Sequence, residues 1–349
     1  MEKFSETLIA WYQSKKRDLP WRNTSNPYFI WLSEIILQQT RVDQGMPYYI
    51  KFVEAFPTID DLANASQDEV LRLWQGLGYY SRGRNLHFTA KQVVAVFNAA
   101  FPTNYNDLIK LKGVGPYTAA AIASFCGNEH KAVVDGNVYR VLARYFGIES
   151  DISSTLAQKE FQQLASGLLS IKKPGIHNQA IMEFGALQCV PKNPNCNQCP
   201  FQNSCFAFLN KKIDSLPNKS KKVKVKIRYF NYLVINKDDF TLIKKRPAGD
   251  IWEGLYEFPL IESHEDLDEN KIINSQAFNN LIESKKYTIG NISLSIKHQL
   301  THQTIFCKFI EINIKEATHL IDFESVLWAN LENYPKPILI QRFYKKNEM

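Results

Sequence analysis

Long hydrophobic runs are missing from this sequence of 349 residues. No stretch approaches the roughly 20 apolar residues that a helix needs to cross a bilayer. The start, Met-Glu-Lys-Phe-Ser-Glu, also lacks the basic flank and apolar segment of a secretion signal. Internal repeats and low-complexity blocks are absent apart from one short basic stretch, which excludes fibrous and disordered classes. We therefore expect a globular, cytoplasmic protein with no membrane partner.

Neither sign of charge is in strong excess: 42 Lys and Arg stand against 35 Asp and Glu, which gives a formal net charge of +7. Residues 211–228, KKIDSLPNKSKKVKVKIR, carry a net +7, while 1–210 carry +3 and 229–349 carry −3. This stretch shows no apolar periodicity before Val223, so it predicts a basic linker between two domains. Such a run acts either as a solvated tether or as a segment that contacts phosphates, and the sequence leaves both open.

The two flanks of this linker differ in hydrophobic periodicity. Before it, apolar residues recur at helical spacing, which predicts an all-α domain over 1–210. After it, apolar and polar residues alternate, which predicts strands and an α+β domain over 229–349. The predicted helices include 4–12, 28–40, 67–74, 85–97 and 118–125, and the clearest predicted strands lie at 223–227 and 292–296.

Cysteine is scarce, with 6 residues, yet four of them lie close together in the spacing C-x6-C-x2-C-x5-C. These are Cys189, Cys196, Cys199 and Cys205. In a reducing compartment such a group indicates a metal centre rather than disulfides. Structural zinc usually has two short Cys pairs and only one occurs here, so the spacing favours one 4Fe-4S cluster over zinc. With no His nearby, we expect a structural clamp rather than the site of chemistry.

A glycine-rich connection, LKGVGPYTAAAIASF, occupies residues 111–125. A turn containing Gly113 and Gly115 between two helices, the second opening at Pro116, leaves backbone N–H groups unpaired. A phosphate can approach such a turn closely, which suits an anion such as a DNA backbone. An ordinary helix-helix connection uses the same residues, and the glycines alone do not separate the two interpretations.

Two carboxylates have settings that suit glycosidic bond cleavage. On the predicted helix 28–40, Glu34 shares a face with Trp31 and Leu37, and this apolar setting favours the protonated form that a general acid needs. Asp135 follows a short apolar run and precedes a helical pattern, so it is also a candidate N-cap. Cleaving such a bond requires one group that protonates the leaving base and one that stabilises an oxocarbenium-like sugar.

These features occur together with WLSEIILQQTRV at 31–42, GLGYYSRGRNL at 76–86 and VVDGNV at 133–138. The combination resembles the helix-hairpin-helix DNA glycosylases, and most closely the MutY-type adenine DNA glycosylases with their iron-sulfur cluster. The resemblance runs from about residue 10 to 210, with the hairpin at 111–118 and the cluster loop at 189–205, and continues more weakly through the second domain. It implies base excision repair of double-stranded DNA by a monomer that excises adenine paired with 8-oxoguanine or guanine, leaving an abasic site.

The resemblance also implies catalytic roles. Glu34 would protonate the adenine and help water reach the sugar, while Asp135 would stabilise the sugar cation. Tyr117 and Asn137 would hold these carboxylates and the attacking water. Tyr117 stands where the bifunctional endonuclease III relatives have a lysine, and without an amine no Schiff base can form with the sugar. We therefore expect base removal without strand cutting.

Further residues match positions that contact DNA in this family. Gln39 and Tyr79 would wedge beside the orphan base, accompanied by Thr40, whereas Tyr80 is either a contact or a packing residue. The glycines of the hairpin would bind the backbone. The adenine pocket would be lined by Arg22, Leu37 and Gln179.

The stretch KKRPAGDIWEGLYEFP at 244–259 resembles the core loop of a Nudix, MutT-like domain. The metal-binding box with its REx2EE core is absent, so nucleotide hydrolysis is not expected. Relatives usually carry Phe-Ser-His in the hairpin that checks for 8-oxoguanine, and Leu300-Thr301-His302 stands there in this chain. Because Thr301 keeps a hydroxyl and His302 keeps a ring, we expect both to contact 8-oxoguanine. Trp252 and Trp328 are expected in the core.

Two other functions fit parts of the sequence. One is an endonuclease III-like lyase acting on oxidised pyrimidines, which Tyr117 and the appended domain disfavour. The other is a catalytically silent, DNA-binding iron-sulfur protein, which the presence of both Glu34 and Asp135 disfavours.

Overall fold

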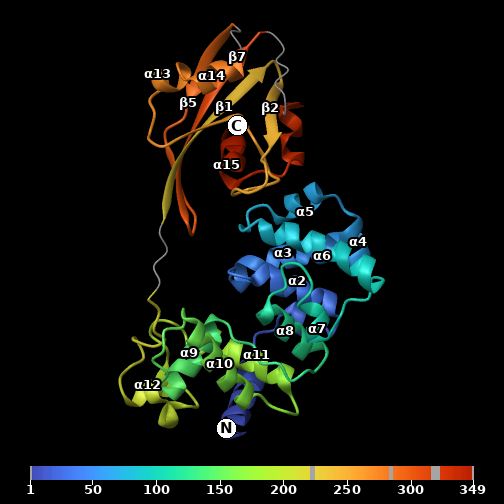
Figure 1. Cartoon of the computed structure of the whole chain (residues 1–349), viewed down its shortest axis with the longest axis vertical. Coiled ribbons are helices and arrows are strands. Elements are labelled where there is room, and N and C mark those ends of the chain that lie inside the picture. The colour runs from blue at the N-terminus through green and yellow to red at the C-terminus, as the bar shows by residue number, and fades with distance from the viewer. Residues whose placement is uncertain (1, 221–224, 283–285, 316–322, 348–349) are drawn as a thin grey trace. The chain divides into compact units, whose positions relative to one another are not determined.

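The computed structural model describes residues 2–220, 225–282, 286–315 and 323–347. Contacts divide the chain into two units (Figure 1). The first comprises Met1–Asn64 and Asn85–Lys221, and the second comprises Ala65–Arg84 and Lys222–Met349. Within the described ranges no helix is long and apolar enough to span a membrane.

The first unit is helical throughout its described part. Its longer helices are amphipathic and carry local start and stop signals, as in α9, which Asp135 caps and which ends at Gly147 with φ 74°. A side chain at Gly147 would lie 2.5 Å from the Phe206 ring, so only glycine fits this helix end. The helices are α1 (Glu2–Lys15), α2 (Pro27–Leu37), α3 (Val42–Ala55), α4 (Ile59–Asn64), α6 (Ser81–Phe97, which begins in the second unit), α7 (Tyr105–Leu108), α8 (Pro116–Cys126), α9 (Gly136–Phe146), α10 (Thr155–Leu168), α11 (Pro174–Leu187) and α12 (Phe206–Leu209).

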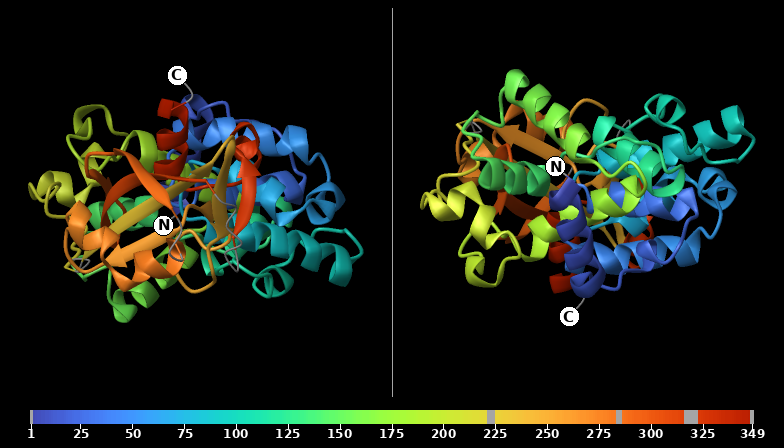
Figure 2. Two further views of the ribbon diagram at one scale, coloured as in Figure 1. Left: turned by 90° about the horizontal axis from the view of Figure 1, so that it is seen from above. Right: turned by 90° about the horizontal axis from the view of Figure 1, so that it is seen from below.

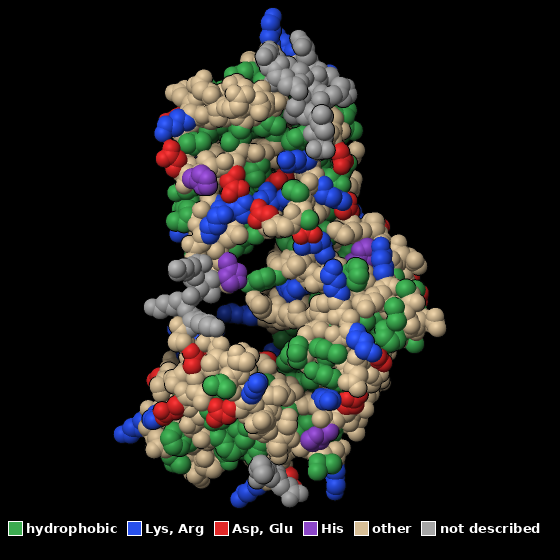
Figure 3. Space-filling view, viewed as in Figure 1, with side chains coloured by type: hydrophobic (Ala, Val, Ile, Leu, Met, Phe, Trp, Pro, Cys, Tyr) green, Lys and Arg blue, Asp and Glu red, His purple; other side chains and the backbone are tan. Residues whose placement is uncertain are grey.

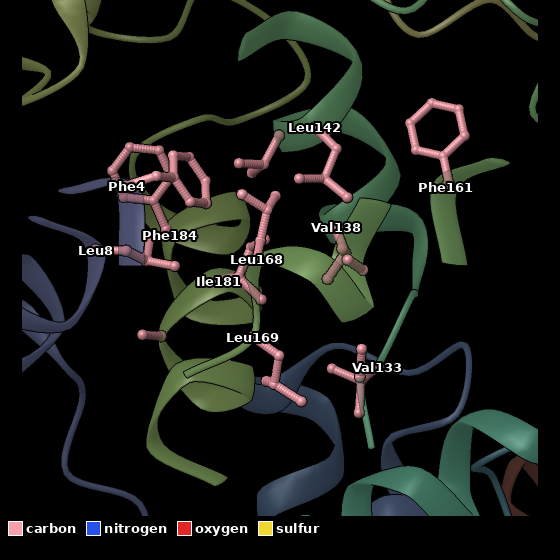
Figure 4. Close-up of a cluster of buried hydrophobic side chains, with 14 of the residues drawn as sticks. Phe4, Leu8, Val133, Val138, Leu142, Phe161, Leu168, Leu169, Ile181 and Phe184 are labelled. Carbon is pink, nitrogen blue, oxygen red and sulfur yellow. The ribbon is translucent and has the colours of Figure 1, made fainter. Parts of the chain in front are cut away.

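A core of buried apolar side chains holds α1, α8, α9, α10 and α11 together. Figure 4 shows Phe4 and Leu8 of α1 lying against Ile181 and Phe184 of α11. Leu142 of α9 belongs to the same cluster and is fully buried. Burying such side chains stabilises the fold by roughly 1.5 to 3 kcal/mol each, so this core fixes the positions of the helix ends that carry Tyr117 and Asp135.

The second unit is a mixed sheet with helices on both faces. Strands follow the order β3-β2-β1-β7-β5, with β4 beside β1, β6 beside β7 and β8 beside β2. The long strands β1 and β7 pair in parallel, and the left view of Figure 2 shows the gold and orange strands of this unit. The elements are α5 (Gln67–Trp74), β1 (Lys226–Lys237), β2 (Phe240–Lys245), β3 (Tyr256–Glu257), β4 (Leu260–Ser263), α13 (Glu269–Ile273), α14 (Gln276–Ile282), β5 (Tyr287–Ile292), β6 (Ile296–Gln299), β7 (Gln303–Ile314), β8 (Glu324–Leu327) and α15 (Ile338–Asn347).

The side chains of β7 alternate between the two faces of this sheet. Phe309 stacks on Phe343 of α15 with ring centroids 4.1 Å apart. The next residue, Ile310, belongs to a buried cluster with Ile272 of α13 and Phe278 of α14. The sheet is therefore covered by α15 on one face and by α13 and α14 on the other. The predicted fold class, an all-α domain followed by an α+β domain, is confirmed.

Three predicted elements differ from the structure. The helix expected over 28–40 ends at Leu37, because Gln39 adopts φ 56° and cannot continue a right-handed helix. The strand expected at 223–227 begins only at Lys226, and Val223 lies outside the described residues. The single strand expected at 292–296 is wrong: β5 ends at Ile292 and β6 begins at Ile296.

The interruption between β5 and β6 has a local cause. The Ser293 side chain accepts a hydrogen bond from the Phe309 backbone N–H, and the Ser293 N–H donates to the Phe309 carbonyl. The register also shifts between Ile289 and Ile292, so the ladder cannot run straight through. Alternation of residue types in the sequence does not reveal such a shift.

Candidate active site

Glu34 lies on α2, which Asn26 caps by accepting a hydrogen bond from the Tyr28 N–H at 3.0 Å. Its neighbours on the chain, Ser33 and Ile35, are buried, and the carboxyl itself is partly buried. Burial raises the pKa of Glu34 to about 7. The charge of Asp135 adds to this rise, whereas the hydrogen bond with the Tyr117 hydroxyl lowers the pKa. Three of the predicted catalytic side chains therefore meet at one place.

Asp135 is the N-cap of α9, as the sequence suggested. Its Oδ1 accepts from the backbone N–H groups of Asn137 at 2.9 Å and Val138 at 2.8 Å. Its Oδ2 accepts from the Asn137 side-chain amide at 2.9 Å. Burial raises the pKa of Asp135, and these hydrogen bonds offset only part of that rise. The carboxylate is thus held rigidly by three donors beside Glu34.

Asn137 is held in turn by a residue that the sequence analysis missed. The Arg140 guanidinium donates to Asn137 Oδ1 at 2.8 Å, to the Cys189 carbonyl at 2.7 Å and to the Gly185 carbonyl at 2.7 Å. A Cβ on Gly185 would lie 2.6 Å from the Asn137 Cβ, so glycine lets α11 approach α9 closely. Arg140 therefore fixes which way the Asn137 amide faces.

Tyr117 lies in the first turn of α8, directly after the glycine-rich connection. Its hydroxyl donates to the Met182 sulfur at 3.1 Å. Burial raises the pKa of Tyr117 well above its usual value, with the charges of Glu34 and Asp135 adding to the effect. The hydroxyl therefore keeps its single proton, which the Met182 sulfur or the Glu34 carboxyl can accept.

One face of α11 lies next to the catalytic side chains of Glu34, Tyr117 and Asp135. Gln179, Met182 and Glu183 follow at helical spacing, and Met182 is the residue that contacts Tyr117. The Tyr12 hydroxyl on α1 donates to Gln179 Oε1 at 2.5 Å. Gln179, predicted from the resemblance, is therefore one helical turn from the residue that touches Tyr117.

Arg22, another predicted pocket residue, is bound by Glu183, which lies on the same face of α11. Glu183 is buried and accepts two hydrogen bonds from Arg22, at 2.9 and 2.7 Å, and two from the Arg17 side chain, at 2.9 and 2.6 Å. Burial alone would raise the pKa of Glu183, but these two arginines lower it to about 2. The charge of Arg22 also lowers the pKa of Glu34, which places the pair near the catalytic cluster.

The other predicted DNA-binding residues of the first unit lie at the end of α2 and in the hairpin. Leu37 packs over Gly45 of α3, where a Cβ would lie 2.8 Å from the Leu37 side chain. Gln39 is exposed with φ 56°, an uncommon conformation for such a side chain, and the partly buried Thr40 follows it.

Gly113 and Gly115 of the hairpin differ in whether the structure requires a glycine at their position. Gly113 has φ 77°, and a Cβ there would lie 2.9 Å from Asn85. Gly115, the N-cap of α8, has ordinary backbone angles and open space around a Cβ. Among the described residues the backbone N–H groups of Gly113 and Gly115 donate no hydrogen bond. The turn therefore offers free donors to an anion.

The second unit holds the remaining predicted DNA contacts. Tyr79 has φ 47° and is 41% exposed, whereas Tyr80 is buried and accepts from the Gly76 N–H, so Tyr80 is a packing residue. The side-chain hydroxyls of Tyr79 and Thr301 are hydrogen-bonded. Thr301 and His302 are exposed at the tip of the hairpin between β6 and β7.

Of the two tryptophans that the sequence placed in the core, Trp252 lies there, whereas Trp328 is only partly buried. Trp252 is buried and lies against Phe230. Trp328 stacks on Tyr344 and donates to Asn236.

The four clustered cysteines line one cavity of about 30 Å³ in the first unit. The buried Arg144 guanidinium contacts the Cys189 sulfur at 3.5 Å and donates to the carbonyls of Val190 and Pro191. Within the described ranges, no three His, Cys, Asp or Glu side chains gather closely enough to hold a single metal ion. Cysteine thiols are the ligands that iron-sulfur clusters use, so the residue types that line this cavity are compatible with such a cluster.

Comparison with known proteins agrees with this arrangement. Residues 32–166 match the HhH-GPD superfamily base excision DNA repair proteins, and residues 231–346 match the NUDIX domain. The adenine DNA glycosylase of Buchnera aphidicola subsp. Baizongia pistaciae (strain Bp) is 37% identical over 95% of this chain and 92% of its own length. The chain belongs to the adenine DNA glycosylase family. The Homo sapiens adenine DNA glycosylase is 45% identical, over 58% of this chain and 39% of its own length.

Solved structures show the same fold for the helical part of this glycosylase. A thermostable thymine-DNA glycosylase is 29% identical with a TM-score of 0.55, over 60% of this chain and 96% of that one. Endonuclease III, trapped as a covalent intermediate on DNA, is 20% identical with a TM-score of 0.52, over 59% of this chain and 94% of that one. As a DNA glycosylase, the protein is a hydrolase that acts on N-glycosyl bonds in DNA.

Several site residues of this glycosylase carry no sequence signal. Arg17, Arg140 and Glu183 look like ordinary charged residues of amphipathic helices. Arg140 and Glu183 are in fact buried, and an unpaired buried charge would be costly. Glu183 holds Arg22 from a distant segment. Arg140 holds Asn137 on its own helix, but only its contacts with the distant Cys189 and Gly185 carbonyls fix it there.

Proposed function

We propose that this glycosylase excises adenine paired with 8-oxoguanine or guanine in double-stranded DNA and leaves an abasic site. It acts as a monomer on chromosomal DNA in the cytoplasm. One observation carries the chemistry: Glu34, with its pKa raised to about 7, lies beside Tyr117 and the capped carboxylate of Asp135. The name and similarity of the relatives support adenine as the base.

The two carboxyls divide the work of hydrolysis between them. Glu34 is partly protonated near neutral pH and donates a proton to the departing adenine, after which it helps to deprotonate the attacking water. Asp135, held by the N–H groups of α9, keeps negative charge close to the sugar as positive charge develops there. Asn137 holds Asp135 Oδ2, and Tyr117 supports Glu34.

Because residue 117 is a tyrosine, the enzyme removes the base and does not cut the DNA strand. A phenol has no amine nitrogen, so Tyr117 cannot form the Schiff base that a lysine forms with the sugar. Borohydride should therefore trap no covalent protein-DNA product under conditions that trap a lysine-dependent lyase. A Tyr117-dependent trapped adduct would contradict this assignment.

The adenine must leave the DNA duplex before Glu34 can reach it. Gln39 and Tyr79 wedge into the gap, and their uncommon positive φ angles support this role because strained backbone concentrates at functional positions. The free N–H groups of Gly113 and Gly115 bind a phosphate. The extruded adenine is held by Arg22, Leu37 and Gln179.

The hairpin tip of the second unit recognises the partner base. Thr301 and His302 are exposed there, and Thr301 is linked to the Tyr79 hydroxyl. These side chains offer a hydroxyl and a ring to 8-oxoguanine, as the sequence predicts. The domain is used for recognition and not for nucleotide hydrolysis, because the sequence lacks the metal-binding box.

Cys189, Cys196, Cys199 and Cys205 would hold a 4Fe-4S cluster, which supplies a structural cross-link when bound. The buried Arg144 guanidinium, 3.5 Å from the Cys189 sulfur, would offset one unit of the negative charge that the thiolates carry. Cys199→Ser should lower bound iron and the visible absorbance of the purified protein. Cys126→Ser, at a cysteine outside this group, should leave both unchanged.

One assay tests the proposed function against its rivals. The protein is incubated with duplexes that carry adenine opposite 8-oxoguanine, adenine opposite guanine, or thymine glycol, and half of each sample is treated with alkali. We expect strand breaks only at adenine and only after alkali. Alkali-independent breaks would indicate a lyase, and tight binding without breaks would indicate a silent binding protein. Glu34→Gln should lower turnover by at least about 10²-fold while binding is retained.

A further inference from the structure

The hairpin between β6 and β7 closes at Gln303. The Leu300 N–H donates to the Gln303 carbonyl at 2.8 Å. Thr301 and His302 lie between these two residues and form the exposed tip of the hairpin. The Lys226 N–H, at the start of β1, donates to the His302 carbonyl at 2.9 Å. The backbone of the tip is therefore connected to the sheet at Gln303 and at His302.

A buried arginine on β1 binds the side chain of Gln303. Lys226 pairs with Gln303 in the parallel ladder, and Arg228 is two residues further along β1. The side chains of Arg228 and Gln303 therefore leave the same face of the sheet. Arg228 Nη1 donates to Gln303 Oε1 at 3.1 Å. Because a guanidinium carries only donors, the amide oxygen and not the NH₂ group must face Arg228.

Arg228 is itself held by two carboxylates from other parts of the second unit. Asp250, in the loop between β2 and β3, accepts from Nη1 and Nη2 at 2.7 and 2.6 Å. Glu262 of β4 accepts from Nε and Nη2 at 2.7 and 2.6 Å. These two bidentate pairs fix the guanidinium in orientation as well as in position. The Gln303 side chain is therefore attached to a fixed point of the sheet.

We propose that Arg228 is a positioning residue for the recognition of 8-oxoguanine, because its hydrogen bond to Gln303 sets where Thr301 and His302 lie. This inference rests on the proposed function, in which these two side chains contact the partner base. 8-Oxoguanine differs from guanine only by an oxygen on C8 and a hydrogen on N7, so discrimination depends on few hydrogen bonds. Such bonds weaken steeply when their distance or angle departs from the ideal. A displaced tip therefore loses the preference for 8-oxoguanine while adenine opposite guanine is still excised.

Variants of Gln303 test this proposal, because removing the buried Arg228 would leave two carboxylates without their cation and endanger folding. Gln303→Met has nearly the same shape but no strong acceptor, whereas Gln303→Glu keeps an oxygen for Arg228. Single-turnover rates of adenine excision are measured opposite 8-oxoguanine and opposite guanine, with the protein in saturating excess. Gln303→Met should lower the ratio of the two rates by about 3- to 10-fold, the effect of one ordinary hydrogen bond. Gln303→Glu should keep the wild-type ratio.

Gln276→Met provides the matched control. Gln276 is the first residue of α14, and its side chain donates to Asn280 at 2.8 Å. The variant makes the same substitution and also loses one hydrogen bond, but away from the hairpin, so the ratio should not change.

A second background tests whether Gln303 acts through the tip. In a protein that carries Thr301→Val and His302→Ala, adding Gln303→Met should not lower the ratio further, because the side chains to be positioned are gone. A wild-type ratio in Gln303→Met, an equal loss in Gln303→Glu, or a further loss in this background would overturn the inference. If the wild type showed no preference for 8-oxoguanine, or if the background without Thr301 and His302 kept that preference, the proposed function of the hairpin would be wrong instead.

Discussion

Tyr79 and Thr301 lie 222 residues apart in the sequence, yet their side-chain hydroxyls share a hydrogen bond. Tyr79 is the proposed wedge, and Thr301 lies in the hairpin proposed to recognise 8-oxoguanine. Both belong to the same structural unit, because residues 65–84 group with the C-terminal residues rather than with the other helices. The helical segment that carries the proposed wedge therefore belongs to the same unit as the hairpin proposed to recognise the partner base.

This relationship predicts that Tyr79→Phe and Thr301→Val each lower the preference for 8-oxoguanine over guanine. Each removes one partner of a single hydrogen bond, so we expect a loss of about 3- to 10-fold. The loss in the double variant should be no larger than that in either single variant. Single-turnover rates on the two mispairs provide the measurement, and independent, multiplicative losses would show that the two hydroxyls act separately.

Glu34 should make stability depend on pH. Its pKa rises from 4.5 to about 7 on folding, so the folded protein holds this proton more tightly than the unfolded chain does. The contribution of Glu34 is therefore fully favourable below pH 4.5 and is lost as pH rises towards 7. Glu34→Gln should be about as stable as wild type at pH 4 and more stable by roughly 3 kcal/mol at pH 8.

Denaturant unfolding at the two pH values measures this difference. A constant offset between variant and wild type at both would contradict the raised pKa. Wild-type turnover should also decline above pH 7, as Glu34 loses the proton that it donates to the base.

Asp135 has two functions, capping α9 and carrying negative charge, and one substitution separates them. Asp135→Asn keeps one side-chain oxygen for the N–H groups of Asn137 and Val138 but removes the acceptor of the Asn137 amide, so stability should fall by about 1 to 3 kcal/mol while the helix cap is kept. Loss of the charge should lower the single-turnover rate by about 10²-fold or more. Asp268→Asn makes the same change at the N-cap of α13 and should leave the rate unaltered. Equal rates for the two variants would remove Asp135 from the mechanism.

The basic linker should contribute to DNA affinity through charge alone. Acidic and basic side chains intermingle on the visible face of each unit, so no broad surface of one sign stands out there (Figure 3). Neutralising four linker lysines should weaken binding and flatten its salt dependence, because fewer counterions are released. The four are Lys219, Lys221, Lys222 and Lys224, of which the last three lie outside the described residues.

The matched control neutralises four exposed lysines elsewhere, namely Lys159, Lys271, Lys345 and Lys346. It changes the net charge of the protein by the same amount. The affinity of each variant for one duplex is measured over a series of salt concentrations. An unchanged slope in the linker variant would show that the run is only a solvated tether.

Local features of this glycosylase followed from the sequence. Helical periodicity, the cap at Asp135 and the glycine at Gly113 depend on residues a few positions away, so neighbouring residue types predict them. The break between β5 and β6 escaped prediction because it depends on Ser293 bonding to Phe309 of another strand. Resemblance to a known family, rather than periodicity or spacing, named most of the site residues.

By itself the sequence determined which residues can do chemistry here: two carboxyls, a tyrosine in place of a lysine, and four cysteines at cluster spacing. Only the tertiary structure decided that Glu34 lies where burial raises its pKa, that Glu183 holds Arg22, and that Tyr12 is hydrogen-bonded to Gln179. The reason is physical. Proton affinity and hydrogen bonding depend on distances of a few ångströms between side chains, and folding brings together groups more than a hundred residues apart.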